Sequence, residues 1–264
     1  MLVNFLDKHK YLWLAVLPLW TYGAFMLAQV LVLAVQHLLL AVGVPLQSMN
    51  QVIYATIVAA MAYVVALVIV IGVPLYAWKR TTTTKDLGAH DWPSWMDIAL
   101  SVPAFAVYII CSGVFMALLA SVFPGINVEQ AQELPFSQSM LGAQWQYLLA
   151  FVTMVVLAPL AEELLFRGYL YGKLRKTAPV WLSVLVASVA FGLAHLWVGN
   201  GPLQWAVAID TFVLSLMLCA LREYTGAVWA GVLLHAIKNG LAFYLLFVNP
   251  SVVDQIKAAV LPLL

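Results

Sequence analysis

The chain has 264 residues, of which 65% are hydrophobic and only 9% are charged. A soluble domain carries about 45–50% apolar and about 25% charged residues, so this composition excludes an ordinary soluble protein and indicates an integral membrane protein. The apolar composition predicts the lipid bilayer as a partner. Twelve Lys and Arg against eleven Asp and Glu leave a net charge of +1, which excludes a basic nucleic-acid-binding face and an acidic tail.

Seven apolar runs are candidates for membrane crossing, because a crossing helix needs about 20 predominantly apolar residues. They lie at 11–42, 51–78, 98–123, 144–161, 180–198, 203–221 and 225–248. The apolar residues 251–264 are too few for an ordinary crossing, and we expect an interfacial or partial helix there. We therefore predict an all-α fold, a polytopic transmembrane bundle of seven helices, or eight if the tail is counted.

The basic residues of the loops predict the orientation of the chain, because Lys and Arg favour the cytoplasmic side. They precede the first run and then fall in every second loop: Lys8 and Lys10, then Lys79, Arg80 and Lys85, then Lys173, Arg175 and Lys176, then Arg222. The loops at 43–50, 124–143 and 199–202 contain neither Lys nor Arg. This alternation supports seven crossings with a cytoplasmic N-terminus, in the plasma membrane if the protein is bacterial.

Ionisable side chains within a membrane are costly and therefore indicate function. The candidates all follow position 160, whereas the first three runs have almost none apart from His37. They are Glu162, Glu163, Arg167, His195, Asp210, His235 and Lys238, with Asn239 as an uncharged companion. We therefore predict three parts: residues 1–143 with three N-terminal membrane helices, residues 144–248 with the active core, and an apolar tail at 249–264.

The two adjacent glutamates predict different roles. Glu163 and Arg167 are four residues apart with the glutamate first, the favourable order for an ion pair on one helix face. Glu162 points about 100° away and has no helical partner of opposite charge, which makes it a candidate general base. The alternative is that both glutamates lie at a helix end in water. Roughly 16 Å of helix between Glu162 and Lys173 argues against that alternative.

The two histidines are ambiguous when each is taken alone. His195 follows Phe191 by one helical turn, and a single histidine on an apolar helix is more often a hydrogen-bonded packing residue than a ligand. His235 and Asn239 share one helix face, which suits either interhelical hydrogen bonding or function. Asp210 is interpreted as a packing or pairing residue, with Lys238 as a candidate partner.

Together these side chains predict a hydrolytic site, and two mechanisms stay open. A carboxylate and an imidazole could activate a water for attack on an amide carbonyl, while a second imidazole and a carboxamide donate to the oxyanion that forms. Alternatively, Glu162, His195 and His235 could hold a divalent metal such as zinc, which acidifies the water. The sequence does not choose between them.

At these residues the chain resembles the CPBP family of intramembrane proteases, also called the Abi or CAAX protease family. Its marks are E-E-x-x-x-R, F-x-x-x-H and H-x-x-x-N/D on successive membrane helices, found here at 162–167, 191–195 and 235–239. The resemblance covers about 144–248. It implies that Glu162 and His195 activate water, that His235 and Asn239 form the oxyanion site, and that Glu163 and Arg167 support the glutamate helix. The family label also implies a metalloprotease.

The function that follows is an intramembrane endopeptidase, which hydrolyses a peptide bond in a membrane-associated protein or peptide. The resemblance implies CAAX-type, leader-peptide or bacteriocin-related processing. The alternatives are a non-catalytic immunity or partner-binding membrane protein, and a transporter that uses the same polar residues as an ion path.

Overall fold

The structure is a computed structural model, and it describes residues 8–123, 134–197, 202–252 and 255. These residues form helices and connecting loops without any strand, so the predicted all-α fold is confirmed. Within these ranges, six helices are long and apolar enough to cross a membrane: Lys10–Ala41, Gln51–Trp78, Trp95–Val122, Gln144–Leu174, Trp205–Thr225 and Trp229–Val248.

A seventh apolar helix, α9 (Val180–Ala194), is shorter than the predicted fifth run. It has 15 residues and measures about 22 Å, less than the hydrocarbon core of about 30 Å. The helix ends at Ala194, and the His195 N–H bonds to the carbonyl of Gly192 in the turn that follows. His195 therefore lies just beyond a helix, whereas the sequence placed it inside one.

The predicted eighth helix falls largely outside the described part of the chain. Residues 251 and 252 are helical, whereas 253–254 and 256–264 lie outside the described residues. The same holds for most of the loops predicted at 124–143 and 199–202.

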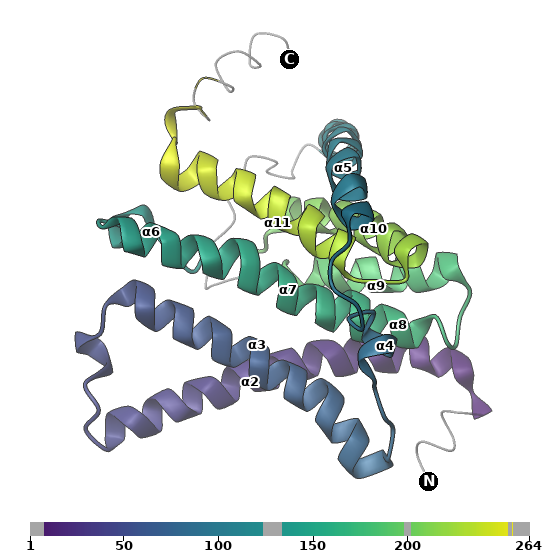
Figure 1. Cartoon of the computed structure of the whole chain (residues 1–264), viewed down its shortest axis with the longest axis horizontal. Helices are drawn as coiled ribbons and strands as arrows, with labels where there is room; N and C mark the ends of the chain where they lie inside the picture. The colour runs from purple at the N-terminus through teal and green to yellow at the C-terminus, as the bar shows by residue number, and fades with distance from the viewer. Residues whose placement is uncertain (1–7, 124–133, 198–201, 253–254, 256–264) are drawn as a thin grey trace.

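Two long helices, α2 (Trp13–Ala41) and α3 (Gln51–Trp78), pack against each other along one side of the molecule (Figure 1). The turn between them is closed by Asn50, whose side chain accepts hydrogen bonds from the N–H groups of Val52 and Ile53. This is the usual way in which a helix N-terminus satisfies its free donors.

The Gln144–Leu174 segment, termed here the central helix, changes its winding along its length. It consists of α6 (Gln144–Phe151), the π-helix η4 (Val152–Leu157), α7 (Ala158–Glu163), the π-helix η5 (Leu164–Tyr171) and α8 (Gly172–Leu174). Short π-helical stretches are rare and occur frequently at functional sites. The two glutamates close the α-helical piece between the two π-helices.

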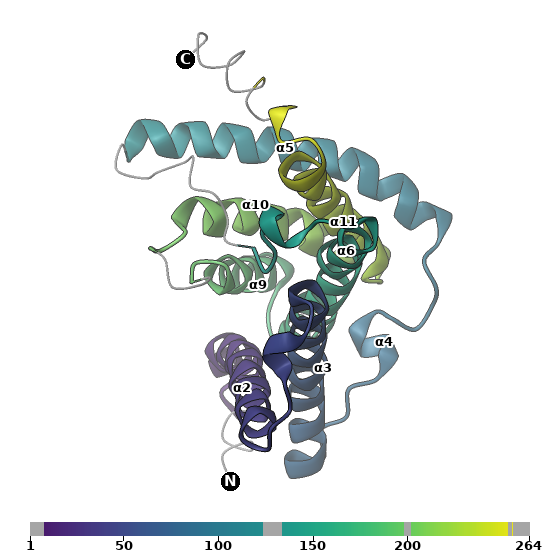
Figure 2. The same ribbon diagram turned by 90° about the vertical axis from the view of Figure 1, so that its left-hand side faces the viewer.

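The remaining helices cover the other side of the central helix. α11 (Trp229–Phe243) continues into the π-helix η6 (Tyr244–Val248) and packs against η4 and α7. α10 (Trp205–Thr225) packs on α9. α5 (Trp95–Val122) is seen nearly end-on in Figure 1 and lengthwise in Figure 2, so it crosses the central helix steeply while contacting α10 and α11.

The loops predicted to be cytoplasmic meet at one end of the molecule. Lys176 pairs with Asp86 in the short helix α4 (Thr84–Leu87), and Arg222 donates to the carbonyl of Asp86. Lys173 donates to the carbonyl of Thr81 at 3.2 Å. This grouping agrees with the alternation of charged loops, while the side of the membrane on which they lie stays a prediction.

Glycine allows α4 to approach the central helix closely. A Cβ at Gly168 would lie 3.0 Å from the carbonyl oxygen of Leu87, and one at Gly172 would lie 2.9 Å from that of Asp86. Glycines four residues apart favour close packing of this kind. The backbone of the charged loop therefore packs directly against the central helix.

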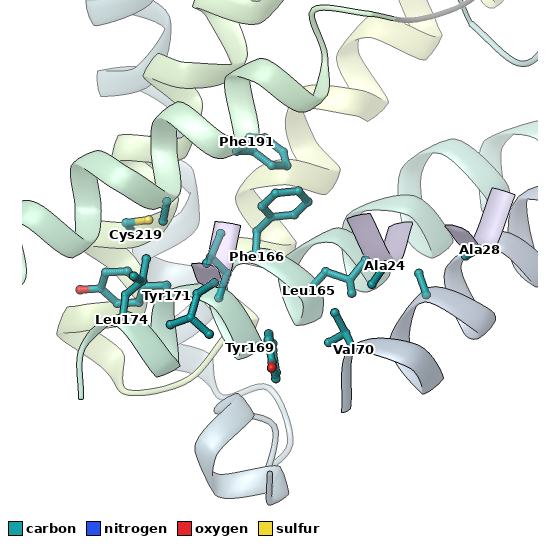
Figure 3. Close-up of a cluster of buried hydrophobic side chains, with 14 residues drawn as sticks. Ala24, Ala28, Val70, Leu165, Phe166, Tyr169, Tyr171, Leu174, Phe191 and Cys219 are labelled. Carbon is teal, nitrogen blue, oxygen red and sulfur yellow. The ribbon is translucent and has the colours of Figure 1, made fainter. Parts of the chain in front are cut away.

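A buried apolar cluster joins the N-terminal helices to the core. Ala24 and Val70 lie close to Leu165 of the central helix, while Phe166 faces Phe191 of α9 (Figure 3). The rings of Phe166 and Phe191 meet edge to face with centroids 4.9 Å apart, a favourable aromatic geometry. This packing fixes the position of Phe191 against the central helix. The carbonyl and the ring of Phe191 both contact His195.

Candidate active site

The predicted ion pair of Glu163 and Arg167 is present and completely buried. Their side chains are 0% and 1% exposed, and Arg167 Nη1 lies 3.1 Å from Glu163 Oε1. The guanidinium also lies over the ring of Phe191, 4.1 Å from its centroid, where a cation–π interaction adds stabilisation. The pair is thus sealed from water in the position that the sequence predicted, and its supporting role for the helix that carries Glu162 stays a prediction.

His235 joins the same carboxylate from α11. Its Nδ1 lies 3.1 Å from Glu163 Oε1, and the side chain is 4% exposed. A carboxylate paired with arginine accepts hydrogen bonds only, so Nδ1 carries the proton. His235 Nε2, on the opposite edge of the ring, lies toward Glu162.

Gly231 makes room for this network. A Cβ at that position would lie 3.1 Å from Glu163 Oε2. Glu163 Oε2 and the Arg167 nitrogens Nε and Nη2 are buried without a hydrogen-bond partner among the described residues. The network therefore joins the central helix to α11 through few bonds, and α11 must remain close to α7 to keep it.

Glu162 lies in a different environment from its neighbour. Its Oε1 accepts a hydrogen bond from the hydroxyl of Tyr63 at 2.6 Å. Its Oε2 lies 3.9 Å from the Nε2 atoms of both His195 and His235, too far for a direct hydrogen bond. The side chain is 16% exposed, so Glu162 is reachable whereas Glu163 is sealed.

The motif F-x-x-x-H has a direct structural meaning here. His195 Nδ1 lies 2.9 Å from the carbonyl oxygen of Phe191, and a carbonyl only accepts, so Nδ1 carries a proton. In the neutral ring, Nε2 then presents a lone pair toward Glu162. The ring of Phe191 contacts both imidazoles, with centroid distances of 4.7 Å to His195 and 5.9 Å to His235.

Asn239 lies one turn beyond His235 and ties α11 to the central helix. Its Nδ2 donates to the carbonyl of Met154 at 3.0 Å. In a π-helix, the carbonyl of Met154 would accept from the N–H five residues later. That residue is Pro159, which has no N–H. The carboxamide thus satisfies a carbonyl in η4 and retains one N–H for another acceptor.

Asp210 and Lys238 form a separate polar group beside the site. Lys238 Nζ lies 3.9 Å from Asp210 Oδ2, as the sequence suggested, and Asp210 Oδ1 accepts from the hydroxyls of Tyr108 and Ser112. These contacts join α5, α10 and α11, and they support the interpretation of Asp210 as a pairing residue.

Sequence reasoning missed Tyr63. It lies in the middle of α3, within the half of the chain that appeared poor in polar groups. Tyrosines in membrane helices are enriched at the two interfaces, so a tyrosine in the middle of a span was the available signal.

The three donors proposed for a metal converge, but not as a closed ligand set. Two ligands on one tetrahedral zinc, with bonds of about 2.0–2.1 Å, lie about 3.3 Å apart, less than the 3.9 Å between Glu162 Oε2 and each Nε2. Within the described ranges, no three His, Cys, Asp or Glu side chains are arranged to hold a metal. Metal dependence stays a prediction.

Comparison with known proteins gave a family match, over the segment that carries the three motifs. Residues 144–241 match the sequence model of a family described as type II CAAX prenyl endopeptidase Rce1-like. Comparisons with curated proteins and with solved structures gave no significant match. The fold thus defines a multi-pass membrane protein, and residues 144–241 are similar to a family of intramembrane endopeptidases.

More particularly, the segment with the three motifs is Rce1-like, and the resemblance to the CPBP family inferred from sequence is confirmed.

Proposed function

We propose that the protein is an intramembrane endopeptidase that hydrolyses a peptide bond with a water activated by Glu162 and His195. The observation that carries this proposal is the convergence of Glu162 Oε2 with the Nε2 atoms of His195 and His235, each 3.9 Å away. These groups come from three segments that are distant in sequence. The Rce1-like match over 144–241 supports the same chemistry.

The separation between Glu162 and His195 suits one shared water. A water that donates one hydrogen to each of two acceptors at about 2.8 Å spans acceptors about 4–4.5 Å apart. The observed 3.9 Å lies just below that range, so a small opening of the site would admit the water. The oxygen of such a water keeps its lone pairs for the scissile carbonyl carbon, and Glu162 takes the proton that it loses.

The remaining groups suit the later steps. The attack creates an oxyanion, which the spare N–H of Asn239 and the Nε2–H of His235 would stabilise. His235 donates from Nε2 only as the imidazolium, since Nδ1 is already a donor to Glu163. Cleavage of the carbon–nitrogen bond then returns the proton from Glu162 to the departing amine.

The substrate class follows from the family description. We propose a peptide or protein that reaches the site from the membrane, with a prenylated C-terminal segment as the first candidate. Leader peptides and bacteriocin-related peptides are the other candidates. The 16% exposure of Glu162 and of His195 leaves the reacting atoms accessible while the supporting ion pair is sealed.

The test is cleavage by the purified protein in detergent or proteoliposomes, with products identified by mass spectrometry. Prenylated and unprenylated peptides of one sequence are compared, together with leader-type peptides, and the metal content is measured in the same preparation. We expect Glu162→Gln and His195→Ala to lower kcat by about 10²–10⁴-fold, the usual contribution of general base catalysis.

Glu223→Gln is the matched control for Glu162→Gln, because Glu223 also accepts a tyrosine hydroxyl at 2.6 Å but lies away from the imidazoles. Wild-type cleavage that survives in both site variants would refute the mechanism. Full biological function in the Glu162→Gln protein would favour a binding or immunity role, and proton-coupled transport without cleavage would favour a transporter.

A further inference from the structure

We propose that Tyr63, supplied by the N-terminal helices, is a positioning residue that fixes the orientation of the Glu162 carboxylate for catalysis. This inference rests on the proposed function. Tyr63 lies outside the family match at 144–241, and no sequence motif pointed to it.

The contact selects which carboxylate oxygen does the chemistry. The Tyr63 hydroxyl donates to Glu162 Oε1 at 2.6 Å, within the short range of charge-assisted hydrogen bonds. A carboxylate held at one oxygen cannot turn freely about its last torsion. Oε2 is therefore kept toward His195 and His235, at 3.9 Å from each Nε2.

Tyr63 is held by a ring contact to α2 and by the packing of its own helix against the central helix. Its ring stacks on Phe25 of α2, with centroids 5.8 Å apart and an interplanar angle of 29°. Two turns earlier on α3, the Thr56 hydroxyl bonds to that of Thr153 in η4 at 3.0 Å. From Thr56 to Tyr63 on α3, the bonded partner moves from Thr153 to Glu162 on the central helix. The two helices therefore run parallel, and these two hydrogen bonds fix their relative position along the axis. The hydroxyl is thus pre-positioned rather than adaptable.

The arrangement gives the N-terminal half a role beyond anchoring. Loss of the hydroxyl leaves Glu162 and both imidazoles in place but frees the carboxylate to rotate away from its productive geometry. Pre-organisation of this kind affects the chemical step more than substrate binding. We therefore expect an effect on kcat with little change in KM.

The test compares Tyr63→Phe with Tyr171→Phe in steady-state peptide cleavage. Tyr171 is the matched control, because its hydroxyl also donates to a carboxylate at 2.6 Å, that of Glu223, outside the site. We expect Tyr63→Phe to lower kcat about ten-fold, equivalent to about 1.4 kcal/mol, with KM within about two-fold. Tyr171→Phe should leave both parameters near wild type.

A double-variant cycle gives a second readout that does not depend on activity. Thermal unfolding is measured for Tyr63→Phe, Glu162→Ala and the double variant. Because the two side chains touch, the losses in Tm should be clearly less than additive in the double variant.

Three results would overturn the role of Tyr63. These are an unchanged kcat in Tyr63→Phe, a rise in KM alone, and additive losses in the cycle. If the wild type cleaves peptides normally, such a result overturns Tyr63 alone and leaves the proposed function standing. Absence of cleavage by the wild type overturns the proposed function first, and the catalytic role of Tyr63 with it.

Discussion

Replacing Arg167 with Met tests the buried network that supports the site. The variant keeps an unbranched side chain but leaves the Glu163 carboxylate, which is 0% exposed, with His235 as its only remaining partner. Removing one partner of a buried ion pair costs about 3–5 kcal/mol. At about 2–4 °C of Tm per kcal/mol, the expected loss is about 6–20 °C.

The assay is thermal unfolding in one detergent, with two comparison variants. Lys176→Met breaks the surface pair with Asp86, whose side chains are 57% and 25% exposed, so solvent screening limits its cost to about 1 kcal/mol or less. The double variant Glu163→Gln/Arg167→Met leaves no unpaired charge and should recover at least half of the loss. An Arg167→Met protein as stable as Lys176→Met, or no recovery in the double variant, would refute the reasoning.

Two further predictions concern space and pH. Gly231→Ala should lower both Tm and activity, because its Cβ would lie 3.1 Å from Glu163 Oε2. Gly113→Ala is the control: its Cβ would meet nothing within 4 Å, so the change should be neutral or stabilising by up to about 1 kcal/mol. The opposite ranking in thermal unfolding would contradict this. The hydrogen bond from Lys176 is the main cause that holds the pKa of Asp86 below its usual value, so its stabilisation is present above about pH 4 and disappears as pH falls through the lower, folded-state pKa. The Tm difference between wild type and Asp86→Asn should therefore shrink on acidification below about pH 4, and a constant difference would count against the pair.

The sequence predicts most of the helices because apolar length alone defines a membrane crossing. The run at 51–78 coincides with α3. The prediction differs most at 180–198, where apolar residues continue past Ala194 but the helix does not. Hydropathy reports the preference of a segment for lipid and says nothing of where its hydrogen bonds end, so the turn that presents His195 was not visible.

Within the site, local spacing predicted local contacts. Glu163 and Arg167 form the expected pair, and Lys238 approaches Asp210. Spacing could not predict that one carboxylate oxygen has two partners: Glu163 Oε1 contacts both Arg167 and His235. The second contact requires α11 to lie close to α7, and Gly231 permits this close approach.

The contact of Tyr63 with Glu162 shows why the partners of the two glutamates could not be predicted without the fold. Adjacent residues on a helix point about 100° apart, so the sequence already places Glu162 and Glu163 on different faces. The element that covers each face depends on packing between segments far apart in the chain. α3 meets Glu162 across 99 positions, and α11 meets Glu163 across 72. Glu162 is thus partly exposed and bonded to a hydroxyl, whereas Glu163 is buried against a guanidinium and an imidazole. No single motif contains this difference, which supports the proposal that Glu162 is the reacting carboxylate and Glu163 a supporting one.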